Sequence, residues 1–138
     1  MGAPPQMPTQ RGARRALEVA WLAHLAAGNP LPDPAAMSAA PAWKQAIALT
    51  RVGGWLPAHE AWEACWRAAP YPQRLLPLAL AKLTAAQVLD RRGQRSRAGV
   101  ARLRAEAAGL LAPFPPNYAG LDVDTLRAGL HAIRLREG

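Results

Sequence analysis

The apolar residues of this chain recur at the three- and four-residue intervals that are typical of amphipathic helices. Ala and Leu are abundant, Val and Ile are scarce, and no segment alternates in the way that predicts a strand. Proline and glycine separate the periodic segments. These segments predict helices over about 12–27, 42–52, 57–70, 78–92 and 96–112, and a last one from Asp122 or Asp124 through Leu126, Leu130 and Ile133.

The arrangement of these segments predicts an all-α, compact, single-domain bundle of about five to six antiparallel helices, because the later connections are short. Residues 1–41 are expected to hold a tail, the first helix and a proline-rich linker, and residues 42–138 the bundle core. Pro113-Phe114-Pro115-Pro116 cannot be helical. We therefore expect an extended loop there, with Phe114 and Tyr118 as buried anchors.

Composition supports a single globular domain. The chain has 138 residues, 51% of them hydrophobic, and its five tryptophans are expected to fill most of the core. Apolar runs end well before the roughly 18 residues of a membrane span. The start of the chain lacks the pattern of a signal peptide. Cys65 is the only cysteine, which excludes an internal disulfide. These features predict a soluble cytoplasmic protein that does not enter a membrane.

The net charge of +8 admits two interpretations. One is a nucleic-acid or other polyanionic partner, and the other is the Arg-rich composition of a GC-rich genome. Six arginines gather around one predicted helix–helix turn: Arg91, Arg92, Arg95, Arg97, Arg102 and Arg104. The aromatic residues are not interleaved with them as a stacking platform would require. A solvated cationic turn is therefore preferred, and nucleic-acid binding stays an alternative.

Residues 59–66 read His-Glu-Ala-Trp-Glu-Ala-Cys-Trp and concentrate the chemistry of the chain. On a helix, His59, Trp62 and Trp66 share one side, and Glu63 lies one turn after His59. Glu60 is rotated by about 100° from His59, toward solvent or a rim. Such a group can bind a metal, move a proton or form a polar network.

Two chemical interpretations of this motif lead to an enzyme. In the first, His59, Glu60 and Glu63 hold a metal, but the further ligands would have to come from His24, Asp90 or His131. In the second, Glu63 or Glu60 orients His59 for the acid–base work of a hydrolase-like enzyme. The sequence shows no nucleophile to accompany it, because Cys65 lies on another helical face. We expect no cofactor and no metal.

The preferred interpretation is structural. His59, Glu63, Trp62 and Trp66 would form a buried polar–aromatic centre, completed by Lys82, which interrupts the apolar face of the fourth helix. A buried Glu63–Lys82 pair would neutralise two otherwise isolated charges. The protein would then serve a structural or interaction role, with an unknown protein partner or a second copy on an exposed face.

The motif also carries a family resemblance. Gly54-Trp55-Leu56-Pro57-Ala58-His59-Glu60-Ala61-Trp62-Glu63-Ala64-Cys65-Trp66-Arg67 resembles the signature of the bacterial domain-of-unknown-function family 309. Arg92-Gly93-Gln94, Pro113-Phe114-Pro115-Pro116 and Gly120-Leu121-Asp122-Val123 extend the resemblance over about 43–133. It implies a small helical bundle and no particular reaction.

The chain departs from that family on the fourth predicted helix. Members of that family usually carry Gln-Gly and then a further Gln on this helix. At the corresponding positions this chain has Leu78, Ala79 and Lys82. If the family glutamines join the His-Glu motif in a polar site, that site is altered here.

Overall fold

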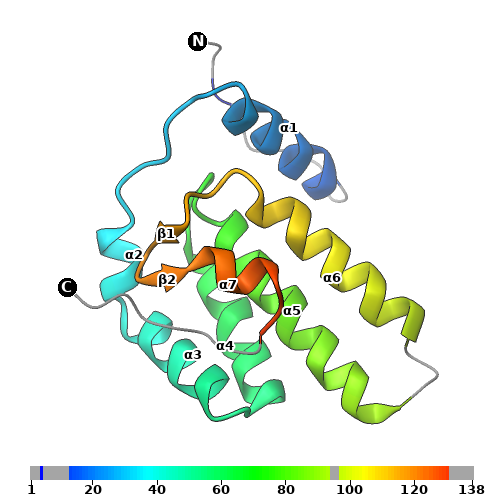
Figure 1. The fold of residues 1–138 in the computed structure, drawn as a ribbon. Helices are drawn as coiled ribbons and strands as arrows, with labels where there is room; N and C mark the ends of the chain where they lie inside the picture. Colours follow the sequence, from blue (N-terminus) through cyan, green and yellow to red (C-terminus); the bar gives the residue numbers. More distant parts are fainter. Residues whose placement is uncertain (1–3, 5–12, 94–96, 131–138) are drawn as a thin grey trace.

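The computed structural model describes residue 4 and residues 13–93 and 97–130. Its elements, in chain order, are α1 (Arg14–Ala26), α2 (Ala35–Ala39), α3 (Pro41–Arg51), α4 (Trp55–Ala68), α5 (Leu75–Arg92), α6 (Arg97–Leu111), β1 (Asn117–Tyr118), β2 (Leu121–Asp122) and α7 (Val123–Arg127). The all-α prediction is confirmed. Figure 1 shows α3, α4, α5 and α6 as successive antiparallel neighbours.

The central helix of this bundle is α5. Its residues from Leu75 to Ala81 are all buried, since α4 packs on one side of it and α6 on the other. The sequence predicted a start at Leu78, yet the helix begins at Leu75 with Pro77 in its first turn. A proline is tolerated there because the first four N–H groups of a helix have no intrahelical partner.

The tryptophans contribute unequally to the core. Trp43, Trp62 and Trp66 are buried, while Trp21 and Trp55 pack against the core with part of their surface exposed. The rings of Trp43 and Trp62 meet edge to face at 4.9 Å between centroids. This pair joins α3 to α4.

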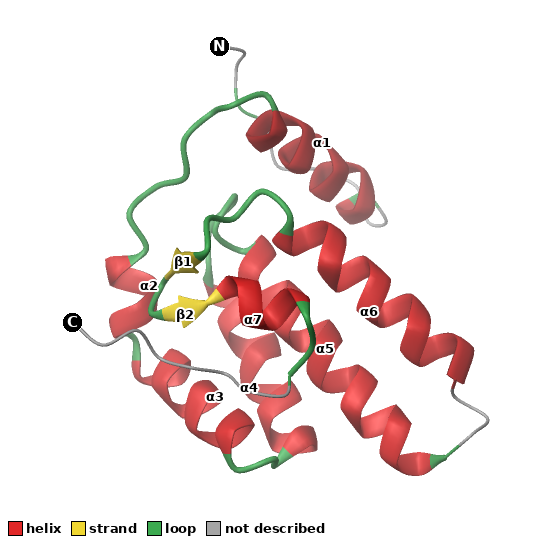
Figure 2. Ribbon diagram, in the orientation of Figure 1, coloured by secondary structure: helices red, strands yellow, loops and turns green. Residues whose placement is uncertain are grey.

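Three short elements were not predicted. A single-turn helix, α2, lies inside the expected linker, and β1 and β2 form a small antiparallel hairpin immediately before α7 (Figure 2). The prediction of no strands is therefore wrong at this hairpin. Long-range bonds hold it, because Tyr118 donates to the carbonyl of Pro32 and Trp43 donates to the carbonyl of Ala119 at 3.2 Å.

The expected anchors of the proline-rich loop are confirmed, since Phe114 and Tyr118 are both buried. The Asp122 side chain caps α7 by accepting a hydrogen bond from the backbone N–H of Thr125. The helix ends at Arg127, whereas the sequence predicted that it continues past Leu130. Ser96 and Ile133, also assigned to predicted helices, lie outside the described residues.

Aromatic contacts attach α1 to the rest of the bundle. Leu17 and Leu25 are the buried residues of α1. The ring of Trp21 stacks on that of Tyr71, with 6.1 Å between the ring centroids. The guanidinium of Arg14 lies 4.5 Å from the ring centre of Trp66. Figure 1 shows α1 alongside α6, so that the two helices face each other across a groove described below.

Candidate functional site

The motif helix α4 begins after a glycine turn. Gly53 has φ 73°, a conformation that favours glycine, and it reverses the chain between α3 and α4. His59 then lies one turn into α4 and faces α5, where its Nδ1 is 2.8 Å from the carbonyl oxygen of Ala81. A carbonyl can only accept, so Nδ1 carries the proton and donates.

The other ring nitrogen of His59 also faces a protein group. Nε2 lies 3.4 Å from Oε1 of Glu63, and the second oxygen of Glu63 lies 3.9 Å from Arg67. The side chains of His59 and Glu63 are 24% and 34% exposed, so this pair lies at the edge of the core. The Nδ1–H group fixes the ring against α5, and Nε2 forms an ion pair with Glu63 only when the imidazole carries a second proton.

The two tryptophans of the motif have different surroundings. The indole N–H of Trp62 donates to the Thr50 hydroxyl at 2.9 Å, and that hydroxyl donates to Ala46 at 2.7 Å. Trp62 therefore packs toward α3. Trp66 lies beneath Arg14 of α1, as described above.

The predicted Glu63–Lys82 pair is wrong. Lys82 lies 3.2 Å from Glu106 of α6 instead, and both side chains are about three-quarters buried. The reason is that successive residues of a helix point in different directions. The carbonyl of Ala81 faces α4, and the next side chain along α5 is rotated by about 100° and reaches α6.

This arrangement brings together a second charged cluster, which the sequence analysis missed. Glu18 of α1 joins Lys82 and Glu106 at the groove between α1 and α6. Burial raises the pKa of Glu18. The cations of Lys82, Arg14 and Arg15 lower that pKa, and the carboxylate of Glu106 raises it. The sequence held a signal for this cluster. Glu18 is next to Leu17 and Glu106 is next to Ala107, so each glutamate borders the apolar face of its helix.

Glu60 is exposed on the outer side of α4. None of four cavities on the described surface is lined by His59, Glu60 or Glu63. Among residues 13–93 and 97–130, no three His, Cys, Asp or Glu side chains are close enough together to hold a metal ion. His131, a candidate ligand from the sequence, lies outside the described residues.

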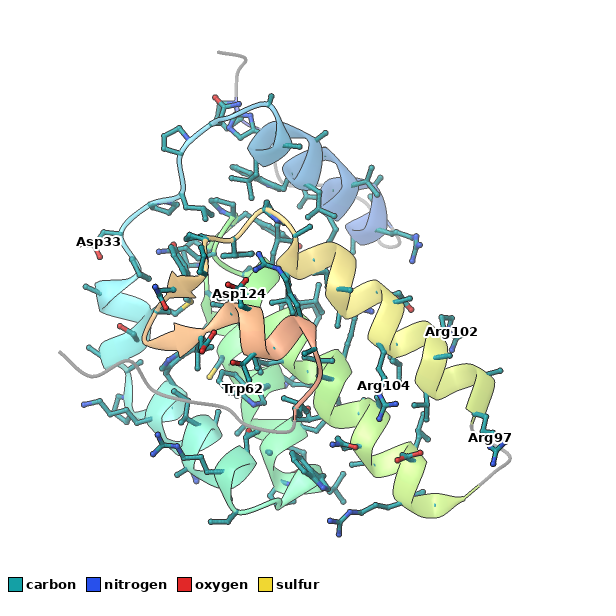
Figure 3. The ribbon with its side chains drawn as sticks, in the orientation of Figure 1. Asp33, Trp62, Arg97, Arg102, Arg104 and Asp124 are labelled. Carbon is teal, nitrogen blue, oxygen red and sulfur yellow. The ribbon has the colours of Figure 1, made fainter. Side chains whose placement is uncertain are left out.

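The arginines near the α5–α6 turn do not share one face. Arg91, Arg92, Arg97, Arg102 and Arg104 are exposed, and Arg95 lies outside the described residues. Figure 3 shows Arg102 and Arg104 on opposite sides of α6, as a spacing of two residues requires. Arg102 also lies 3.8 Å from Glu106. The positive charge therefore surrounds the end of this hairpin.

These observations define a small helical-bundle protein in which a His-Glu motif joins the two central helices. Residues 43–101 match a family model described as Domain of unknown function (DUF309), which supports the resemblance carried by the motif. The match covers α3, α4, α5 and the start of α6. Neither the curated proteins nor the solved structures provide a match to the chain. None of the described helices has the length and apolar character to span a membrane.

Proposed function

We propose that this protein acts by binding a protein partner and not by catalysis, with the His59 motif linking α4 to α5. The supporting observation is that both ring nitrogens of His59 face groups of the protein itself. Nδ1 lies 2.8 Å from the Ala81 carbonyl and Nε2 lies 3.4 Å from Glu63. A general base or a metal ligand has to present a free nitrogen to a substrate or an ion.

Replacing His59 with alanine is expected to lower the free energy of unfolding by about 1–2 kcal/mol, because it removes the bond to Ala81 and leaves Glu63 without its neighbour. For a domain of this size the melting temperature falls by roughly 3–7 °C. Thermal unfolding followed by circular dichroism measures this change. Glu60→Ala, at the adjacent exposed position, is the control and is expected to change stability by less than about 0.5 kcal/mol. Equal melting temperatures for wild type and His59→Ala would contradict the structural role.

The surface best suited to a partner is the outer side of α3. A hollow of about 460 Å³ lies there, between α3 and the turn of the β1–β2 hairpin. Trp43, Ile47 and Ala119 are among its lining residues, together with the exposed cations Lys44 and Arg51. Next to it, at the α3–α4 turn, Val52 is 79% exposed. Apolar surface bordered by cations is complementary to a partner segment that carries apolar and acidic side chains. A second copy of this chain would bring like charges together.

A photo-reactive amino acid at position 52, introduced in the source cells, is expected to cross-link one discrete acidic protein, identified by mass spectrometry. Calorimetry with that purified protein then tests the surface. Lys44→Glu combined with Arg51→Glu is expected to weaken binding at least about tenfold, since charge complementarity is reversed. The matched control, Arg91→Glu with Arg97→Glu, alters the net charge equally at the far end of the molecule. Equal weakening by both double variants, or no discrete cross-link, would contradict the proposal.

A further inference from the structure

A groove of about 200 Å³ lies between α1 and α6, away from the outer face of α3. Arg15, Glu18 and Leu22 line it from α1, and Glu106 and Leu110 line it from α6. Lys82 reaches it from α5. The groove therefore combines charged side chains from three helices with apolar walls.

The two carboxylates of the groove are in different situations. Glu106 has three cations near it, with Lys82 at 3.2 Å, Arg102 at 3.8 Å and Arg15 at 3.9 Å. Glu18 is half-buried, and none of the described cations lies within 4.0 Å of its carboxylate. Burial raises the pKa of Glu18, although Lys82, Arg14 and Arg15 act on it from longer range and lower it. Glu18 is therefore the carboxylate of this groove that is available to pair with a cationic group of a ligand.

Arg15 supplies the opposite charge on the same helix. Residues three apart on a helix are neighbours, about 5–6 Å between their Cβ atoms. The Arg15 side chain is 82% exposed, so it can turn toward a ligand without leaving a buried position. A positive and a negative side chain therefore lie within a few ångströms of each other on α1.

We propose that this groove binds a small aliphatic α-amino acid, with its ammonium group on Glu18, its carboxylate on Arg15 and its side chain against Leu22 and Leu110. Arg15 and Glu18 offer a ligand one charge of each sign at the groove. A zwitterion can match both charges, whereas a singly charged ligand matches only one of them. A cavity of about 150 Å³ holds benzene, so this groove holds a molecule of valine size.

Gly109 offers a way to close the groove without removing any charge. A Cβ atom built at this position meets no atom within 4 Å, and Gly109 lines the groove from α6. A methionine there would project into the space that the ligand occupies. The helix should tolerate it, because glycine in a helix interior is less favourable than most other residues by about 0.5–1 kcal/mol.

Isothermal calorimetry with the full chain and valine tests the proposal. Wild type is expected to bind valine with a Kd of about 1 mM or below. The monopolar relatives 3-methylbutanoate and 2-methylpropan-1-amine, each lacking one of the two charges, are expected to bind at least about tenfold more weakly. Glu18→Gln and Gly109→Met are each expected to weaken valine binding by at least about tenfold. Glu60→Gln, on an exposed face of α4, is expected to bind like wild type.

Circular dichroism melts establish that the variants are folded, so that a loss of binding is separated from a loss of structure. No heat from valine, leucine or alanine at about ten times the expected Kd would overturn the proposal. Equal binding of either monopolar relative, or undiminished binding to folded Gly109→Met, would overturn it as well.

Discussion

Replacing Trp62 with alanine is expected to lower the free energy of unfolding by about 3–5 kcal/mol, because it leaves a large cavity in the core. Trp62 is fully buried, and its ring meets Trp43 edge to face. Its indole N–H also donates to Thr50. The substitution therefore removes apolar contacts and a buried hydrogen bond together, and it separates α3 from α4.

Chemical denaturation followed by tryptophan fluorescence measures this loss. Trp55→Ala is the matched control, since Trp55 begins the same helix and packs on the core with part of its surface exposed. Its loss is expected to be less than half as large. If the two variants lose the same stability, the Trp62 side chain does not have the central packing role assigned to it, and a functional reason for its place in the motif gains weight.

The Cys65 thiol is expected to react with iodoacetamide about 100-fold more slowly in the folded protein than in the unfolded chain at pH 8. Burial raises the pKa of Cys65 from 9.0 to about 11. The thiolate is the reactive form. At pH 8 the raised pKa lowers its fraction by about two orders of magnitude. Cys65 also lies in an apolar setting, beside Trp43 and Ala69 at a cavity of about 280 Å³.

Mass spectrometry of timed samples gives the alkylation rate. Ala64→Cys in a Cys65→Ala background places a thiol at the neighbouring exposed position and is expected to react at the rate of a free cysteine. A Cys65 rate as high as that of this control would show an activated thiolate. Such a result would restore the acid–base interpretation of His59, because it would supply the nucleophile that the sequence does not show.

The long helices were predictable because their signals are local. The apolar spacing and the glycine turn at 53–54 locate α4, and the i, i+4 spacing places Glu63 beside His59 whatever the rest of the fold does. The family resemblance, carried by the same residues, is confirmed over 43–101. Local spacing cannot tell which neighbouring helix a given face will meet.

The short elements were missed for a related reason. α2 and the β1–β2 hairpin have too few residues for a periodic pattern, and they are held by contacts between distant segments. Tyr118 bonds to Pro32, 86 residues away, and Trp43 bonds to Ala119, 76 residues away. The start of α5 was misjudged because Pro77 was expected to delay the helix, although a first-turn proline costs no hydrogen bond.

The contacts of Lys82 show which features of this protein follow from local sequence and which require the assembled fold. The sequence determined the helices, the family of the central segment, and the His59–Glu63 contact, because each depends on residues within a few turns of one another. The partner of Lys82 depends on the rotation of α5 between α4 and α6 and on the packing of α1 beside α6. That packing brings Glu18 and Glu106, 88 residues apart, to a single groove, and no local pattern specifies a contact over that separation.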